Sequence, residues 1–130
     1  MAGNINTFVI DSSFILGFLL PDENNQLVVD FFNKYALKEI RFMAPLLLSF
    51  EVVNGLRNAY LSSRINQLTV FNLINDFLSY KIITKEVDLP EVFKISQDKN
   101  LSIYDATYLC LAKSENIPLL TLDEKLATAR

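Results

Sequence analysis

The sequence contains no histidine and no tryptophan, and its 130 residues include one cysteine and three glycines. The absence of histidine removes zinc hydrolases and Ser-His-Asp enzymes in their usual forms. The glycines at positions 3, 17 and 55 are too far apart for a Walker loop or a dinucleotide-binding turn. The single cysteine, Cys110, excludes an internal disulfide, so we expect a protein of the reducing cytoplasm.

Long apolar runs are missing as well, although 51% of the residues are hydrophobic and the mean hydropathy is +0.25. The longest run, at 14–20, has seven residues, whereas about 20 are needed to span a bilayer. No basic segment precedes it, so we expect neither a membrane span nor a signal peptide. A length of 130 residues predicts a single domain over 1–130 with a real hydrophobic core.

Four carboxylates stand within or directly after apolar segments, far apart in the sequence: Asp11, Glu51, Asp105 and Asp123. An unpaired carboxylate would cost several kcal/mol if it were buried in such surroundings. One buried acid can find a local partner, but four acids in a chain without histidine point to a shared cation. Carboxylate oxygens are hard ligands, so we expect a Mg²⁺ or Mn²⁺ site.

Short apolar segments alternate with helical patterns along the chain. We predict strands at 7–10, 41–44, 81–84 and 118–121. Ser12 or Ser13 is expected to cap the first helix, and Pro45 to stand in the first turn of a helix reaching residue 60. Further helices are expected at 24–37, 65–79, 89–100 and 102–115, with a short one at the end. This alternation predicts a three-layer α/β/α sandwich with a short parallel central sheet.

The predicted fold would bring the acids together. Asp11 and Asp123 both follow strand ends, and ligands of parallel sheets bind in the crevice outside those ends. Asp105 begins a helix at that same edge. Glu51 comes from the middle of a helix and must point inward, with Asn54 and Asn58 on the same helical face.

Each acid also has a plainer structural explanation. Ser102 and Asp105 are spaced as a capping box, and Asp123 could be a first-turn acid behind a Thr121 cap. Asp11 could cap the helix that it precedes. A residue in the middle of a helix has no capping role, so Glu51 would instead have to face solvent or pair with Arg57 or Lys81.

Taken together and in order, four segments resemble the PIN-domain ribonucleases, most closely the VapC-type toxins of toxin–antitoxin pairs. These segments are Val9–Ser13, Ser49–Leu56, Ser102–Leu109 and Leu119–Asp123. The resemblance implies a PIN-like fold and a metal-dependent endoribonuclease. It implies that Asp11, Glu51, Asp105 and Asp123 hold one or two Mg²⁺ or Mn²⁺ ions, with Asp11 and Asp105 as the preferred direct ligands. Ser12, Asn54 and Thr121 would orient these carboxylates or contact phosphate.

The same resemblance implies an RNA substrate, a VapB-like antitoxin that fills an apolar groove near the active site, and a homodimer. The formal net charge of −3 does not exclude RNA, because neutralising the four acids would bring it to +1. Eight apolar residues exceed what a core of this size needs, which favours the dimer: Phe14, Ile15, Phe18, Leu19, Phe31, Phe32, Leu73 and Phe77. Two alternatives stay open: a PIN-like module that binds RNA or protein without cleaving it, and an aspartyl-phosphate domain using Asp11.

Overall fold

The structure is a computed structural model, and it describes residues 6–23 and 25–129. Strands and helices alternate within this part of the chain. The elements are β1 (Asn6–Ile10), α1 (Ser12–Leu19), α2 (Gln26–Ala36), β2 (Ile40–Pro45), α3 (Leu47–Leu61), α4 (Gln67–Ser79), β3 (Ile83–Lys85), α5 (Leu89–Lys99), α6 (Ile103–Glu115), β4 (Leu119–Leu120) and α7 (Glu124–Ala127).

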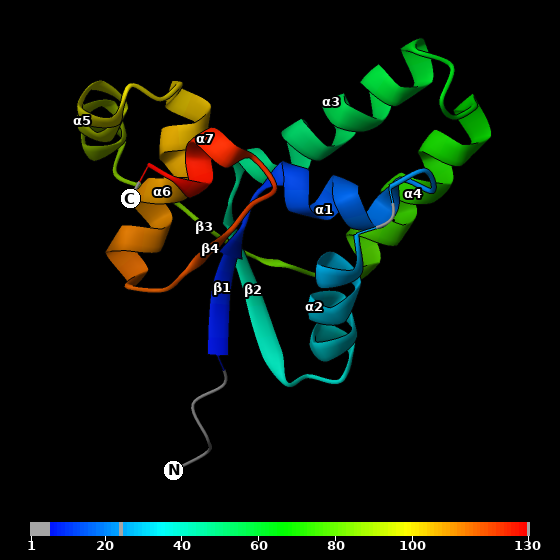
Figure 1. The fold of residues 1–130 in the computed structure, drawn as a ribbon, viewed down its shortest axis with the longest axis horizontal. Coiled ribbons are helices and arrows are strands. Elements are labelled where there is room, and N and C mark those ends of the chain that lie inside the picture. The colour runs from blue at the N-terminus through cyan, green and yellow to red at the C-terminus, as the bar shows by residue number, and fades with distance from the viewer. Residues whose placement is uncertain (1–5, 24, 130) are drawn as a thin grey trace.

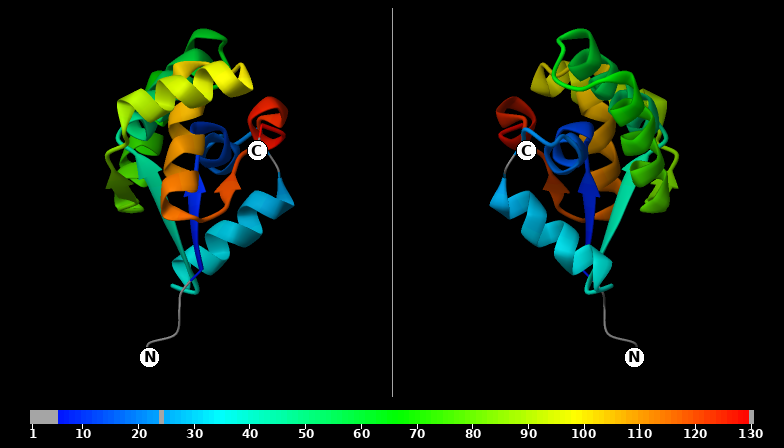
Figure 2. Two further views of the ribbon diagram at one scale, coloured as in Figure 1. Left: turned by 90° about the vertical axis from the view of Figure 1, so that its left-hand side faces the viewer. Right: turned by 90° about the vertical axis from the view of Figure 1, so that its right-hand side faces the viewer.

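The four strands form one parallel sheet in the order β3-β2-β1-β4. Val9 pairs with Met43 on one side and with Leu119 on the other, so β1 is buried between two neighbours. Helices α6 and α7 lie on one side of the sheet and α1 and α2 on the other (Figure 1). Side views show α6 along one face and α2 across the opposite one (Figure 2). The predicted three-layer α/β/α sandwich is confirmed.

Several predicted boundaries were wrong. Pro45 is the last residue of β2, where it pairs with Lys85, and α3 begins after it at Leu47. The third strand starts at Ile83 and not at residue 81, because Lys81 has a left-handed backbone, with φ of 52°, just after α4. Helix α2 begins at Gln26 behind an Asn25 cap, and the predicted start at residue 24 lies outside the described residues.

The core takes up the eight apolar residues that we had assigned to a dimer surface. Phe14, Ile15 and Phe32 are among the buried members, and Phe18 and Phe31 pack against them half-buried. The phenylalanine rings of α1 and α2 meet one another: Phe18 and Phe32 stack with centroids 4.1 Å apart, and Phe14 and Phe31 meet edge to face at 5.7 Å. That prediction was wrong for these side chains. Other apolar side chains are exposed. Leu46, Leu89, Ile103 and Tyr104 gather with Pro45 and Lys85 at the ends of β2 and β3, and Phe50 and Phe93 are exposed on α3 and α5.

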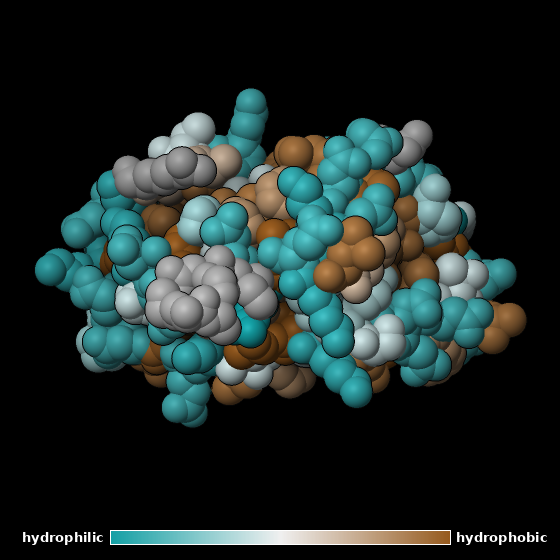
Figure 3. All heavy atoms as spheres, turned by 90° about the horizontal axis from the view of Figure 1, so that it is seen from below, coloured by the Kyte–Doolittle hydropathy of each residue, from teal (hydrophilic) through white to brown (hydrophobic). Residues whose placement is uncertain are grey.

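The opposite end of the sheet, where the strands begin, shows apolar surface interrupted by hydrophilic side chains (Figure 3). None of the described helices has the length and apolarity that a membrane crossing requires.

Candidate active site

Asp11 is the most buried acid of the predicted site, with 4% of its surface exposed. It follows the last residue of β1 and caps α1, since its Oδ1 accepts a hydrogen bond of 3.0 Å from the Phe14 backbone N–H. The Ser13 hydroxyl donates to the same oxygen at 2.7 Å, and the Thr121 hydroxyl donates to Oδ2. The prediction of Ser12 or Ser13 as the cap is therefore wrong, and the alternative that Asp11 caps this helix is confirmed.

Burial raises the pKa of Asp11 despite these three hydrogen bonds. The bonds from Thr121, Ser13 and the Phe14 N–H favour the charged form and oppose this effect, while the negative charge of Asp105 adds to it. Asp11 is thus a carboxylate whose charge is only partly compensated by its hydrogen bonds.

Glu51 points inward from α3, as predicted, and meets α6. Its Oε1 accepts a hydrogen bond of 2.6 Å from the Tyr108 hydroxyl and a longer one of 3.4 Å from Ser12. Burial is the main cause that raises the pKa of Glu51, and the charges of Asp105 and Asp11 raise it further. The alternative that Glu51 faces solvent or pairs with a basic residue is wrong, because no ion pair among the described residues includes it.

Asp105 stands in the first turn of α6, where its backbone N–H donates to the Ser102 hydroxyl at 3.0 Å. Ser102 is therefore the helix cap, as the capping-box spacing predicts. Burial raises the pKa of Asp105, the charge of Asp123 raises it further, and Lys125 partly offsets both effects. The side chain is half-buried.

Asp123 is exposed and caps α7, where its Oδ1 accepts hydrogen bonds from the backbone N–H groups of Lys125 (2.9 Å) and Leu126 (3.3 Å). The prediction that Thr121 caps this helix is wrong, because the cap is Asp123, two residues later. Thr121 instead accepts a hydrogen bond from the Asp123 N–H at 2.9 Å while donating to Asp11. One hydroxyl thus ties the loops that carry two of the acids.

Electrostatic effects connect the four acids in one place. The charge of Asp105 raises the pKa of both Asp11 and Glu51, and the charge of Asp123 raises that of Asp105. Like charges act on one another in this way only when they are close. No described ion pair compensates any of them.

Hard oxygen donors with uncompensated charge suit Mg²⁺ or Mn²⁺. Within residues 6–23 and 25–129, no three acid or cysteine side chains are already placed to enclose a single ion. Mg²⁺ keeps several waters and needs only one or two direct carboxylate contacts, so the donor chemistry of this site suits it better than an ion that requires a full cage of protein ligands.

The three predicted supporting residues lie in different surroundings. Ser12 contacts Glu51, and Thr121 contacts Asp11. Asn54 is exposed on α3, and the structure shows no hydrogen bond from its side chain to a described residue of the site. Its role stays a prediction.

Two residues of the site were missed by the sequence analysis. Ser13 bridges two loops, since its hydroxyl donates to Asp11 and accepts from the Leu122 N–H at 2.9 Å. Tyr108 is 1% exposed and aims its hydroxyl at Glu51. Burial, and then the carboxylate of Glu51, raise the pKa of Tyr108, so the phenol stays protonated and remains a donor. The signal available in the sequence was its spacing of three residues from Asp105, which places both on one helical face.

The model of one protein family, the PIN domain, matches residues 8–130. The chain belongs to the PIN-domain family. Among curated PIN relatives, Ribonuclease VapC1 of Mycobacterium tuberculosis, from strain CDC 1551 / Oshkosh and from strain ATCC 25618 / H37Rv, is 37% identical over 95 residues. These residues are 72% of this chain and 71% of the relative.

Solved structures share the PIN fold at low sequence identity. The crystal structure of PAE2754 from Pyrobaculum aerophilum has a TM-score of 0.77 and 20% identity, over 96% of this chain and 80% of that one. The crystal structure of Mycobacterium tuberculosis VapC20, described as a Sarcin-Ricin loop cleaving toxin, has a TM-score of 0.62 and 16% identity over 94% of both chains. The sequence resemblance to PIN-domain proteins is confirmed.

Proposed function

We propose that this PIN-domain protein is a cytoplasmic Mg²⁺- or Mn²⁺-dependent endoribonuclease, the toxin of a VapBC-type pair. The observation that carries the proposal is that the Thr121 hydroxyl donates to Asp11 and accepts from the Asp123 N–H, which ties two acids together, while the charge of Asp105 raises the pKa of Asp11 and of Glu51. Four carboxylates gathered without an ion pair to any of them among the described residues are poorly explained by capping alone. The name of the 37% identical relative, a ribonuclease, supports the choice of RNA as substrate.

Asp11, Glu51 and Asp105 would hold the ion, and one ion or two could be accommodated by the four acids. When bound, the metal supplies a nucleophilic water at neutral pH and stabilises charge on the leaving oxygen of the phosphodiester. The protein's own groups do the positioning. Thr121 and Ser13 fix the Asp11 carboxylate by hydrogen bonds to its two oxygens.

Asp123 is suited to a different task from the other three. It is exposed, and its described hydrogen bonds both end on Oδ1. We assign its Oδ2 the orientation of the attacking water, and Ser12, Asn54 and Thr121 the contacts to carboxylates and phosphate around it.

The first prediction is cleavage of at least one structured RNA that depends on added Mg²⁺ or Mn²⁺ and stops in chelator. Asp11→Asn should abolish cleavage, because it removes a charge at the centre of the acid cluster. Asp30→Asn is the matched control, since Asp30 lies on the surface of α2 and accepts a hydrogen bond from Gln26. Gel analysis of tRNA and ribosomal RNA digests measures the activity.

The outcomes separate the open alternatives. Cleavage that survives Asp11→Asn would show that another mechanism or a contaminant is responsible. RNA binding without cleavage by the wild type would favour the non-catalytic module. Beryllium fluoride binding that depends on Asp11 would favour the aspartyl-phosphate alternative, and failure to bind would remove it.

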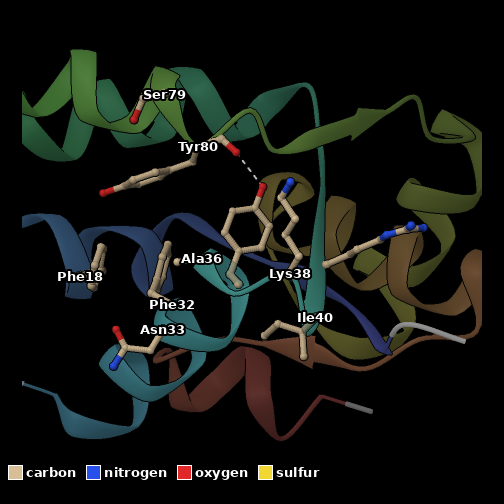
Figure 4. A pocket seen from close by; sticks show the side chains of 10 residues that line it. Phe18, Phe32, Asn33, Ala36, Lys38, Ile40, Ser79 and Tyr80 are labelled. Carbon is tan, nitrogen blue, oxygen red and sulfur yellow. Dashed lines mark hydrogen bonds between the residues drawn. The ribbon is translucent and has the colours of Figure 1, made fainter. Parts of the chain in front are cut away.

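The partner prediction concerns an apolar pocket of about 600 Å³ between α1, α2, β2 and α4. Phe18, Phe32 and Tyr80 line it, and the Tyr35 hydroxyl donates to the Tyr80 carbonyl at 2.6 Å (Figure 4). We assign this pocket to an apolar helix of a VapB-like antitoxin. It includes Ile40 at the start of β2 and so extends away from the acids, which follow strand ends. This assignment therefore departs from the expectation of a groove near the active site.

Two exposed cations, Lys38 and Arg41, line the same pocket and favour an antitoxin helix with acidic residues beside its apolar face. Lys38→Glu should weaken capture of a co-expressed antitoxin at low salt, whereas Lys94→Glu, on the outer side of α5, should not. Equal capture by both variants would show that this pocket does not bind the antitoxin, and it would leave the nuclease proposal unchanged.

A further inference from the structure

We propose that Tyr108 is a positioning residue that makes Glu51 present a single oxygen to the metal, and that this selects Mg²⁺ or Mn²⁺ over Ca²⁺. The inference rests on the metal site of the proposed function. It concerns which ion that site accepts, which the presence of four acids does not determine.

The contacts that support this proposal lie on one carboxylate oxygen of Glu51, Oε1. Both hydrogen bonds that Glu51 accepts from described side chains end on Oε1, at 2.6 Å from Tyr108 and 3.4 Å from Ser12. The other oxygen, Oε2, is engaged by no described side chain. The two bonds take up both lone-pair directions of Oε1 and leave none for a cation, whereas Oε2 keeps its own.

The hydroxyl is held firmly where it is. Tyr108 is 1% exposed, so its ring is fixed by packing and its oxygen has no access to bulk water. It stands three residues after Asp105 on α6, whereas Glu51 comes from α3. Helix α6 therefore supplies one carboxylate of the site directly and fixes the orientation of a second one from the neighbouring helix.

The number of oxygens that Glu51 offers matters because Ca²⁺ and Mg²⁺ differ in the coordination that they accept. Ca²⁺ takes about six to eight oxygens and readily binds a carboxylate through both of its oxygens. Mg²⁺ is smaller and requires near-octahedral coordination, with single-oxygen carboxylate contacts and retained waters. Blocking Oε1 removes a ligand that Ca²⁺ would use and Mg²⁺ would not.

The experiment compares Tyr108→Phe with the wild type. The substitution keeps the buried ring and removes only the hydroxyl. The matched control is Tyr35→Phe, which loses a tyrosine hydrogen bond of the same 2.6 Å length to the Tyr80 carbonyl, in the pocket away from the acids. Free Mn²⁺ is measured by electron paramagnetic resonance, and Mg²⁺ and Ca²⁺ are titrated as competitors to give both dissociation constants.

We expect the ratio of Ca²⁺ to Mg²⁺ affinity to rise by at least about 10-fold in Tyr108→Phe, the lower end of what loss of an outer-shell partner changes in metal affinity. Tyr35→Phe should keep the wild-type ratio. A Tyr108→Phe ratio equal to that of the control, or a parallel loss of both affinities, overturns the proposal. A wild type that binds no Mn²⁺ at all overturns the metal site of the proposed function as well.

Ser12→Ala gives a second test should Tyr108→Phe not fold, which circular dichroism would show. It removes the other donor to Oε1, at a position that is half-buried at the start of α1. In Ser12→Ala the ratio of Ca²⁺ to Mg²⁺ affinity should also rise, but less than in Tyr108→Phe, because the Ser12 bond to Glu51 is longer than the Tyr108 bond. No change of the ratio in a folded Ser12→Ala, with Tyr108→Phe unfolded, also counts against the proposal.

Discussion

Asp105 is the residue at which the capping role and the metal role predict opposite results. In the structure the cap is Ser102, and the Asp105 carboxylate is half-buried near other acids, which raises its pKa. The charged form is therefore disfavoured in the fold. Removing that charge should relieve repulsion in the metal-free protein and weaken the response to metal.

Thermal melts of Asp105→Asn, with Mn²⁺ and with chelator, test this. The metal-free variant should be as stable as the wild type or more stable, and the wild type should gain about 2.7 kcal/mol at 100-fold over its dissociation constant for the metal. Glu91→Gln is the control, because Glu91 is also a half-buried first-turn acid, on α5. It should leave the metal response unchanged.

If Asp105 only stabilises the first turn of α6, the thermal melts should give the opposite result. The variant would lose about 0.5–1 kcal/mol in both conditions, and the wild type would show no metal-dependent shift. That result would require Asp105 to be removed from the site.

Two helical glycines have different surroundings: Gly55 in α3 faces α1, whereas Gly17 in α1 faces Leu122 and Val28. A Cβ at Gly55 in α3 would lie 2.3 Å from Leu16 Cδ1 and 3.2 Å from its Cγ, so more than the tip of that side chain would have to move. A Cβ at Gly17 in α1 would lie 3.7 Å from Val28 Cγ2, an ordinary contact, and 2.7 Å from Leu122 Cδ1, the tip of a side chain that is 39% exposed and free to turn away.

The two alanine variants should therefore differ in sign. Gly17→Ala should be neutral or stabilising by up to about 1 kcal/mol, because alanine favours the helix. Gly55→Ala should be destabilised by about 1–3 kcal/mol from overpacking, less the same helical gain. Urea denaturation of both variants measures the difference, and a Gly55→Ala protein at least as stable as Gly17→Ala would contradict the packing described.

Much of this element-level structure was predictable from local pattern. A β-branched run ending in Asp11 gave β1, and the Ser102 cap followed by an apolar stretch gave α6. Pro45 was placed wrongly because proline suits the first turn of a helix and the end of a strand equally well. Only the pairing of Pro45 with Lys85 of β3 shows that this proline ends a strand.

The candidate site was also predictable in part from the sequence. Acids after strand ends must meet at one edge of a parallel sheet, which brought Asp11 and Asp123 together. Tyr108 was missed because a tyrosine in an apolar helix is typical of a core. Its function depends on α3 crossing the sheet edge close to α6, and no local pattern contains that contact.

At the scale of the whole molecule, the apolar surface that the sequence assigned to a dimer lies on other residues than expected. Leu46, Leu89, Ile103 and Tyr104 surround one pocket of about 510 Å³ formed by the ends of β2 and β3 and by α5 and α6. Phe50, on the adjoining turn of α3, is 79% exposed, and Leu89 is 68% exposed. A surface of this kind that continues across several elements is typical of an interface.

We expect this surface to join two copies of the chain, next to Glu51 and therefore beside the proposed metal site of each copy. Phe50→Asp should convert the dimer to a monomer, because the partner would have to bury an unpaired charge in place of a large aromatic side chain. Phe71→Asp is the control: Phe71 is 57% exposed on α4, outside the set of residues around this pocket. Sedimentation at tens of micromolar distinguishes the two states. A wild type that sediments only as a monomer would refute the dimer, and a dimer that persists in Phe50→Asp but is lost in Phe71→Asp would move the interface to α4.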